Sequence, residues 1–260
     1  MNISVCCPSY KRPRVKTLDY LPFCKVYVDH KEYEEYVSNN KEGANIISCP
    51  EGIQGNVARI RNYILDTEFT NGADAVVLLD DDLSGVFKFT VASNNFGYVQ
   101  EIITAEQFMP WVEKYTRLCS EFGYKLWGVN CNFDKLSYKH YSPFSTLSVV
   151  LGPFCCHLKN DIRYDEALPL KEDYDMAIQH LNKYRGILRL NGFHYVCAQS
   201  TNKGGCAVMR NQRREKEQFE LLQKKWGSQI VREDRSNKGK TKKQKRFDYN
   251  PIIKVPIKGI

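Results

Sequence analysis

The chain has 260 residues, of which 42% are hydrophobic, and its formal net charge is +8. This length allows one large domain, or a domain with a tail, and the hydrophobic content is sufficient for a core. No stretch reaches the roughly 18 to 20 apolar residues of a membrane span, and the N-terminus lacks the pattern of a signal peptide. We therefore expect a cytoplasmic protein without a membrane span.

The ten cysteines predict reduced thiols rather than a disulfide framework, because the chain is far larger than a small secreted scaffold. Six of them lie in apolar or strand-like surroundings and are expected to be small core residues: Cys6, Cys7, Cys49, Cys119, Cys131 and Cys197. Cys155-Cys156-His157 offers soft metal ligands, but no second C-x-x-C pair completes a zinc set.

The first third of the chain alternates strand patterns with helix patterns. Strands are expected at 2–7, 25–29, 45–49 and 75–79, and helices at 32–39 and 57–66. This alternation is typical of a doubly wound, mostly parallel sheet.

The later segments continue this pattern. A helix is expected at 101–122, and further strands at 126–130, 147–151 and 187–198. A surface loop is expected at 131–146, and a helix from Glu172 to about Tyr184. A basic helix is expected at 212–226, and regular structure is expected to fade after it.

Three adjacent carboxylates, Asp80, Asp81 and Asp82, follow the apolar strand predicted at 75–79. Open α/β sheets bind ligands at the carboxyl ends of their strands. Adjacent carboxylates repel each other unless a positive group neutralises them, and Mg²⁺ or Mn²⁺ suits carboxylate oxygens. The pattern predicts a divalent-cation site, and a solvated acidic turn is the alternative.

Two loops have the composition of a nucleotide or phosphate site. Pro8-Ser9-Tyr10-Lys11-Arg12-Pro13 is a rigid, basic loop after the first strand. Thr201-Asn202-Lys203-Gly204-Gly205-Cys206 is a tight turn whose backbone N–H groups, with Lys203, suit a departing phosphate, although such a turn is also ordinary. A third group, the acids Glu172, Asp173 and Asp175, opens a predicted helix, where the macrodipole favours negative charge.

The C-terminal region is strongly basic. Residues 236–246 contain six Lys or Arg and no acid. Such a cluster attracts the phosphate backbone of nucleic acid, and a solvated tail is the alternative interpretation. We expect a domain at 1–230 and a basic, partly extended tail at 231–260.

Four motifs in this order resemble the glycosyltransferases of the GT-A fold: the loop 8–13, the glycine turn and Arg-containing helix at 52–62, Asp80-Asp81-Asp82, and Glu172-Asp173. The details, over about residues 2–210, are most similar to the phage-encoded TET/JBP-associated glycosyltransferases, which are proposed to put sugars on hydroxymethylated pyrimidines of viral DNA. The resemblance implies an α/β, GT-A-like, Rossmann-related fold. Its central sheet would be mostly parallel and flanked by helices, with a basic C-terminal extension.

The resemblance also implies roles for individual residues. The nucleotide-sugar donor, expected to be a UDP-sugar, would contact Pro8, Ser9, Tyr10, Arg12, Asp29, Arg59 or Arg61, and Asp80. Apart from the resemblance, we expect Asp81 and Lys203 to contact the donor as well. The metal, Mn²⁺ or Mg²⁺, would be held by Asp82 and Asp80, with His194 as a late candidate ligand that is otherwise a core or surface histidine. Asp173, beside Glu172, would be the general base.

The preferred function is thus metal-dependent transfer of a sugar to a hydroxymethylated base of phage DNA, in the cytoplasm of the host cell. The loop 133–144 is rich in Tyr and Phe and would offer stacking surfaces to a flipped base. The alternatives are the same fold with a polysaccharide or protein acceptor, a nucleotidyltransferase, and a non-enzymatic nucleic-acid binder. The sequence leaves open the sugar, retention or inversion at its anomeric carbon, and the oligomeric state.

Overall fold

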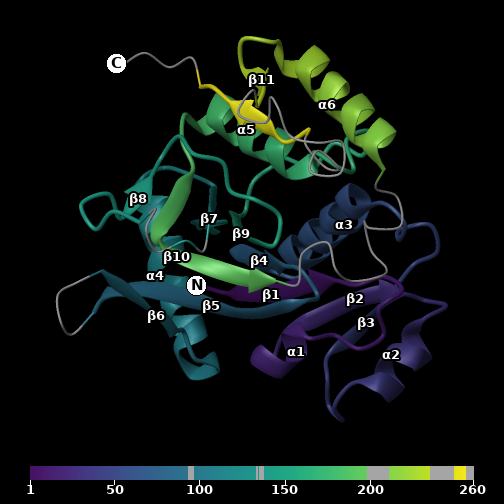
Figure 1. The fold of residues 1–260 in the computed structure, drawn as a ribbon. Helices are drawn as coiled ribbons and strands as arrows, with labels where there is room; N and C mark the ends of the chain where they lie inside the picture. The colour runs from purple at the N-terminus through teal and green to yellow at the C-terminus, as the bar shows by residue number, and fades with distance from the viewer. Residues whose placement is uncertain (93–96, 133, 135–137, 198–210, 235–248, 256–260) are drawn as a thin grey trace.

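A mixed β-sheet of ten strands forms the centre of the molecule (Figure 1). The computed structural model describes residues 1–92, 97–132, 134, 138–197, 211–234 and 249–255. The strand order is β3-β2-β1-β4-β9-β7-β10-β5-β6, and β8 pairs with β10 outside this path.

The N-terminal half-sheet follows the predicted alternation closely. Its elements are β1 (Ile3–Pro8), α1 (Thr17–Tyr20), β2 (Lys25–Asp29), α2 (Tyr33–Asn39), β3 (Ile46–Cys49), α3 (Val57–Thr70) and β4 (Ala75–Leu79). The four strands pair in parallel, so their carboxyl ends meet at one edge of the sheet. The predicted order of strands and helices in this region is confirmed.

The second half contains more strands than the sequence predicted. Its elements are β5 (Leu83–Val91), β6 (Tyr98–Ile102), α4 (Ala105–Glu121), β7 (Leu126–Asn130), β8 (Phe144–Ser145), β9 (Phe154–Leu158), α5 (Glu172–Tyr184), β10 (Leu188–Cys197), α6 (Gln212–Trp226), β11 (Val231–Glu233) and β12 (Pro251–Ile253). β7 and β10 run in the direction of β4, whereas β5, β8 and β9 run against it. The sheet is therefore mostly parallel, as expected, with antiparallel insertions.

The strand predicted at 147–151 is wrong. The strand of this region is β9, which lies antiparallel between β4 and β7 and is buried along its whole length. Its sequence, Phe-Cys-Cys-His-Leu, lacks the β-branched residues that usually mark a strand. Val150 instead packs against Gly128, where a Cβ would lie 2.2 Å from the valine Cγ1.

The helix predicted at 101–122 begins four residues later. Glu101 and Ile102 belong to β6 and pair with Lys88 and Phe87 of β5. Thr104 then caps α4 with a capping box, in which its hydroxyl accepts from the N–H of Gln107. The edge hairpin β5–β6 thus takes the residues that a helical pattern alone would assign to α4.

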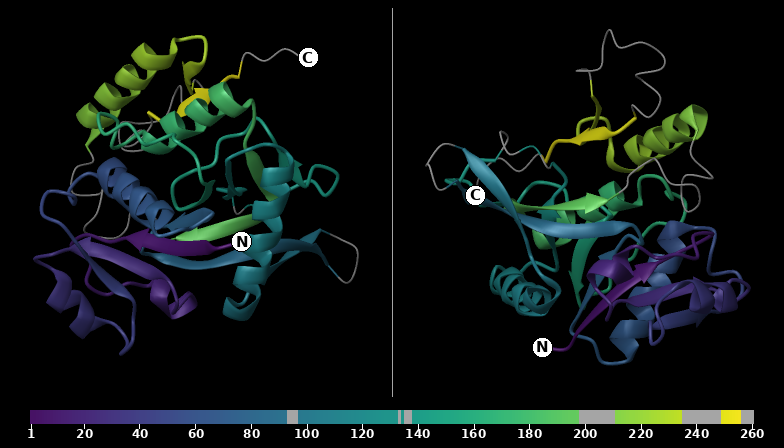
Figure 2. Two further views of the ribbon diagram at one scale, coloured as in Figure 1. Left: turned by 180° about the vertical axis from the view of Figure 1, so that it is seen from behind. Right: turned by 60° about the horizontal axis from the view of Figure 1, so that its bottom comes forward.

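Helices cover both faces of the sheet (Figure 2). Alternate residues of each strand enter different cores, so Val77 and Leu79 face the α1, α2 and α4 side, and Val76 and Leu78 face α3 and α5. A third cluster lies outside these layers and joins α5, α6 and the β11–β12 pair. Regular structure therefore continues beyond Trp226, contrary to the expectation that it fades there.

The described cysteines are free thiols. Cys6, Cys7, Cys49 and Cys119 are buried as expected, whereas Cys197 is half-buried and Cys131 is exposed, because Cys131 lies just after the end of β7. Among the described residues, the helices are too short or too polar to cross a membrane.

Candidate functional site

The carboxyl ends of β1, β2 and β4 bring the predicted donor residues to one edge of the sheet. Pro8 ends β1, Asp29 ends β2, and the three aspartates follow β4. Thr17 fixes the aspartate turn: its backbone N–H donates to the carbonyl of Asp81 (3.1 Å) and its hydroxyl to that of Asp80 (2.6 Å). The loop after β1 therefore lies directly against the acidic turn.

Asp81 is the buried anchor of this loop. Its carboxylate accepts from the Ser9 hydroxyl (2.5 Å) and pairs with the Arg12 guanidinium. The Tyr36 hydroxyl completes the network, because it lies 2.9 Å from Ser9 Oγ and accepts from the Arg12 N–H (3.0 Å). Burial raises the pKa of Asp81 to about 6, although Arg12 and Ser9 favour its charged form. Ser9, Arg12 and Asp81 thus hold the predicted nucleotide loop in place.

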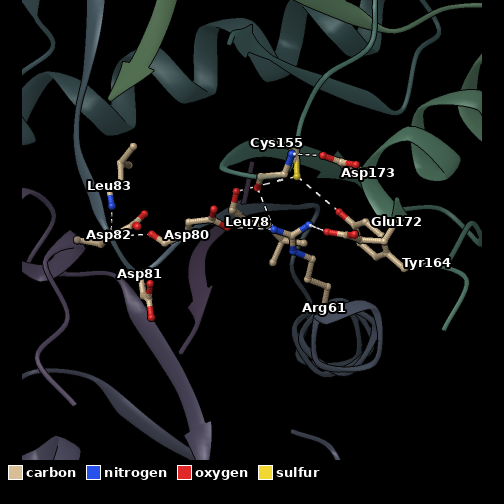
Figure 3. A network of polar contacts seen from close by, with 12 residues as sticks. Arg61, Leu78, Asp80, Asp81, Asp82, Leu83, Cys155, Tyr164, Glu172 and Asp173 are labelled. Atoms are coloured by element: carbon tan, nitrogen blue, oxygen red, sulfur yellow. Dashed lines mark hydrogen bonds and ion pairs between the residues drawn. The ribbon is translucent and has the colours of Figure 1, made fainter. Parts of the chain in front are cut away.

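Arg61 joins the end of β4 to the start of α5 (Figure 3). Its guanidinium lies 3.0 Å from Asp80 Oδ1 and 3.1 Å from Glu172 Oε1, and it also donates to the carbonyl of Gly152 (3.2 Å). Only 3% of the arginine side chain is exposed, and the ring of Tyr164 lies 5.6 Å from its central carbon. One buried cation therefore joins Asp80 to Glu172, which lies 111 positions after Arg61 in the chain.

Asp173 lies beside this ionic link. Its Oδ2 accepts from the N–H of Gly152 (3.3 Å), and its Oδ1 accepts from the N–H of Tyr174 (2.8 Å). Arg61 pairs with Glu172, whereas these bonds to Asp173 come from backbone donors, so the two adjacent acids have different surroundings. Of the two, Asp173 has the environment of a carboxylate that is oriented by the backbone.

Asp80 and Asp82 are the carboxylates with the chemistry of a divalent-cation site. About a third of the Asp80 side chain is exposed, and Asp82 Oδ2 lies 3.6 Å from Arg12 Nη1. Burial raises the pKa of Asp80; Arg61 opposes this shift, and Asp82 adds to it. The described residues contain no group of three His, Cys, Asp or Glu that converges as a metal site. Two hard oxygen ligands nevertheless fit Mg²⁺ or Mn²⁺, which in nucleotide enzymes takes one or two carboxylates plus substrate phosphates and water.

His194 lies in an aromatic layer. Its ring is buried and stacks on Phe87 (centroids 5.5 Å apart) and against Phe89 (4.9 Å), and burial lowers its pKa. In the pairing of β10 with β5, His194 stands opposite Phe87, whereas Cys197 stands opposite Leu83, the residue after Asp82. The structure thus brings Cys197, rather than His194, close to the acidic turn.

The remaining predicted residues make contacts of their own. Arg59 is exposed and pairs with Glu166 (2.8 Å). Asp29 accepts from the N–H of Lys31 (2.9 Å), and the ring of half-buried Tyr10 lies 5.0 Å from Lys11 Nζ. Lys203 lies outside the described residues.

Several residues of the site carry no signal in the sequence. Gly152 is required because a Cβ there would lie 2.8 Å from both terminal nitrogens of Arg61. The Gln54 amide donates to the carbonyls of Ser9 (3.3 Å) and Tyr27 (3.2 Å) and so joins β1 and β2 to the glycine turn. The sequence predicted the glycine turn at 52–56, in which Gln54 lies, but not these contacts.

Comparisons with known proteins agree with this architecture. No protein-family profile and no curated protein matches the chain. Among solved structures, it is similar to S. aureus TarS 1-349 in complex with UDP-GlcNAc, with a TM-score of 0.51 and 15% identity over 85% of this chain and 65% of TarS 1-349. The chain thus spans just under two thirds of that protein. The fold is that of the GT-A glycosyltransferases.

Two further structures are less similar. Glucosyl-3-phosphoglycerate synthase from Mycobacterium tuberculosis, in complex with Mn²⁺, UDP-glucose and phosphoglyceric acid, gives a TM-score of 0.49 and 12% identity over 91% of this chain and 85% of that one. A197 from STIV gives 0.41 and 14% over 81% and 92%.

Proposed function

We propose that this chain is a glycosyltransferase that uses a nucleotide-sugar donor and a divalent cation. One observation carries the proposal: within a GT-A fold, buried Arg61 joins Asp80, at the end of β4, to Glu172, and Asp173 lies beside this link. Asp80 and Asp82, which we propose as cation ligands, and Asp173, which we propose as the base, are thus close enough for both Asp82 and Asp173 to act on the pKa of Asp80.

The donor is proposed to be a UDP-sugar, a class supported by the UDP-GlcNAc complex of TarS. Its nucleotide would lie over the ends of β1 and β2, at Pro8, Tyr10 and Asp29. Asp82 and Asp80 would hold the cation, which neutralises the negative charge of the diphosphate leaving group. Because Ser9 and Asp81 are buried against each other, and Arg61 is buried between Asp80 and Glu172, we propose that they shape this site from below.

Asp173 is proposed as the general base. An acceptor hydroxyl has a pKa far above neutral, so a positioned carboxylate must take its proton as attack proceeds. The N–H groups of Gly152 and Tyr174 orient the Asp173 carboxylate, and Glu172, paired with Arg61, would keep the start of α5 in place.

The acceptor is proposed to be a hydroxymethylated pyrimidine of phage DNA. A groove of about 430 Å³ supports this class, because its lining includes Lys88 and Lys114 and no acid. Of its aromatic lining residues, Tyr115 and Tyr138 are half-buried and Phe144 is exposed, whereas Phe89, Trp111 and Phe193 are buried behind them in the core. Aromatic faces with flanking cations are the pattern that binds unpaired bases. The basic stretch 236–246 falls outside the described residues.

The donor assignment is tested by a thermal-shift panel of nucleotide sugars with Mn²⁺, followed by a donor-hydrolysis assay. A UDP-sugar should stabilise the protein, and Asp82→Asn should lose most of the cation-dependent part of that stabilisation. Unchanged hydrolysis and cation response in Asp82→Asn would remove the metal assignment.

The acceptor assignment is tested with hydroxymethylated DNA, and unmodified DNA of the same sequence as control. Removal of 236–246, or the double change Lys88→Ala and Lys114→Ala, should weaken DNA binding and flatten its salt dependence. Donor hydrolysis that DNA does not stimulate would favour a polysaccharide or protein acceptor. Release of pyrophosphate from a nucleoside triphosphate would indicate a nucleotidyltransferase, and DNA binding without any turnover would indicate a non-enzymatic binder.

A further inference from the structure

Helix α6 lies along the segment 165–175, which ends in the first turn of α5. Lys225 Nζ contacts Asp165 Oδ2 at one end of this segment (2.7 Å). In the middle, the Gln218 side chain donates to the carbonyl of Ala167 (3.1 Å) and accepts from the N–H of Leu170 (3.5 Å). α6 therefore binds the main chain that leads into the proposed catalytic turn.

The contact closest to that turn is a buried ion pair. Lys171 Nζ lies 2.6 Å from Glu215 Oε2, and the two side chains are 2% and 3% exposed. Lys171 is the N-cap residue of α5 and directly precedes Glu172 and Asp173. Glu215 of α6 therefore holds Lys171, the residue that directly precedes the proposed catalytic turn.

A second polar contact joins α6 to the same turn. Trp226 Nε1 donates to Asp175 Oδ1 (2.7 Å), and Lys225 Nζ lies 2.9 Å from the same oxygen. Asp175 has no exposed side-chain surface. The first turn of α5 is thus held by α6 through Lys171 and Asp175, while Glu172 and Asp173 of the same turn contact Arg61 and Gly152.

Apolar packing also holds α6 against α5. Leu168 and Ile178 pack with Phe219 and Leu222 of α6 in the third core cluster, and Figures 1 and 2 show the two helices side by side. A buried ion pair adds little stability compared with apolar residues of similar size, but its geometry is more specific. The pair Lys171–Glu215 therefore suits a role in fixing position rather than in holding the helices together.

We propose that α6 is a brace that sets the orientation of the catalytic turn, and that Lys171 and Glu215 are its positioning residues. This inference rests on the proposed function, because it assigns the role through Asp173. The proposal gives a role in transfer to α6, which lies outside residues 2–210, the part of the chain whose motifs resemble the GT-A enzymes.

The test compares Lys171→Met, Glu215→Gln and the double variant Lys171→Met/Glu215→Met with the full-length protein. Each single change removes one member of the buried Lys171–Glu215 pair, so thermal stability should fall. The double variant replaces the pair with apolar side chains and should regain most of the stability. The matched control is Lys183→Met, which removes the exposed pair of Lys183 with Asp161 near the other end of α5.

The decisive readout is the kinetics of the double variant. We expect a fall of roughly tenfold or more in kcat for transfer, with the donor KM within about twofold of wild type and a changed pH–rate profile, and near-wild-type kinetics for Lys183→Met. A double variant with wild-type kcat, one that fails to fold, or one that loses donor binding in proportion to kcat would each overturn the positioning role. Thermal stabilisation of the wild-type protein by the donor tests the proposed function separately. If the chain does not use a nucleotide sugar, neither the wild type nor any variant should be stabilised.

Discussion

The sequence alone does not distinguish the role of Arg61 from that of its neighbour Arg59. Arg61 occupies a helix position two residues after Arg59, and a nucleotide-binding role would suit either. The two arginines differ in burial. The side chain of Arg61 is 3% exposed and lies between two carboxylates, whereas the side chain of Arg59 is 41% exposed. A buried cation must be paired, since the loss of hydration is otherwise too costly.

Arg61→Ala should therefore be strongly destabilising. It leaves Asp80 and Glu172 without their shared cation, and we expect the free energy of unfolding to fall by about 3 kcal/mol. Arg59→Ala removes an exposed pair and should change it by less than about 0.5 kcal/mol. Urea unfolding of both variants measures the difference, and equal losses would contradict the role given to Arg61.

Gly152→Ala tests the same link from its other side. The added Cβ would stand 2.8 Å from both terminal nitrogens of Arg61, so the guanidinium must move away from Asp80 or Glu172. Overpacking of this kind costs about 1–3 kcal/mol, and donor hydrolysis should fall as well. Gly192→Ala is the control, because there the nearest atom is the Tyr138 hydroxyl at 3.3 Å. A Gly152→Ala protein that matches this control in stability and hydrolysis would show that the close approach is unimportant.

At the scale of elements, α5 and β9 together bury histidines that stay neutral. His180 of α5 and His157 of β9 are fully buried, with ring centroids 6.0 Å apart. Burial lowers the pKa of His180 to about 4, although its hydrogen bond to the Met176 carbonyl favours the charged form. Burial also lowers the pKa of His157 well below its usual range. Two charged groups act on the pKa of His180: Lys183 lowers it and Asp161 raises it.

This burial makes stability depend on pH. The folded pKa of His180 lies below the unfolded value of about 6.5, so the unfolded chain binds the proton more readily and stability is lost as the pH falls below about 6.5. Between about pH 7 and pH 5, His180 should account for about 2 kcal/mol of this loss. His180→Phe should therefore show a smaller fall than wild type in urea unfolding at the two pH values. The exposed His140→Asn is the control, and an identical fall in all three proteins would refute the assignment.

At the scale of the whole molecule, the C-terminal region takes part in the fold. Val231 is fully buried in the third core cluster, and Tyr249 and Ile253 pack against it. A boundary at 230 would separate these residues from α6, although the basic composition of residues 236–246 indicates a tail.

A chain that ends at 230 should therefore be less stable than one that ends at 255. Burial of a large aliphatic side chain contributes about 1.5–3 kcal/mol, and we expect the shorter chain to lose about 2–4 kcal/mol of unfolding free energy. Thermal and urea unfolding of the two chains make the comparison. Equal stability would mean that β11 and β12 are dispensable and would support the boundary at 230.

The sequence by itself determined the N-terminal half-sheet and the acidic edge. A short apolar run rich in branched residues, such as Ala75–Leu79, favours a buried strand over a helix. Parallel strands bring the residues after their carboxyl ends to one edge. Local patterns of this kind therefore predicted the position of Asp80–Asp82 and the start of α5 at Glu172.

Only the tertiary structure decided how those acids are used. The pairing of Arg61 with Asp80 and Glu172, the close approach of Gly152, and the contacts of α6 with the start of α5 all join residues distant in the chain. Their cause is the desolvation of charges in a packed interior, which selects partners by position in space and not by spacing in sequence. For the same reason β9, whose strand character comes from burial between β4 and β7, was visible only in the fold.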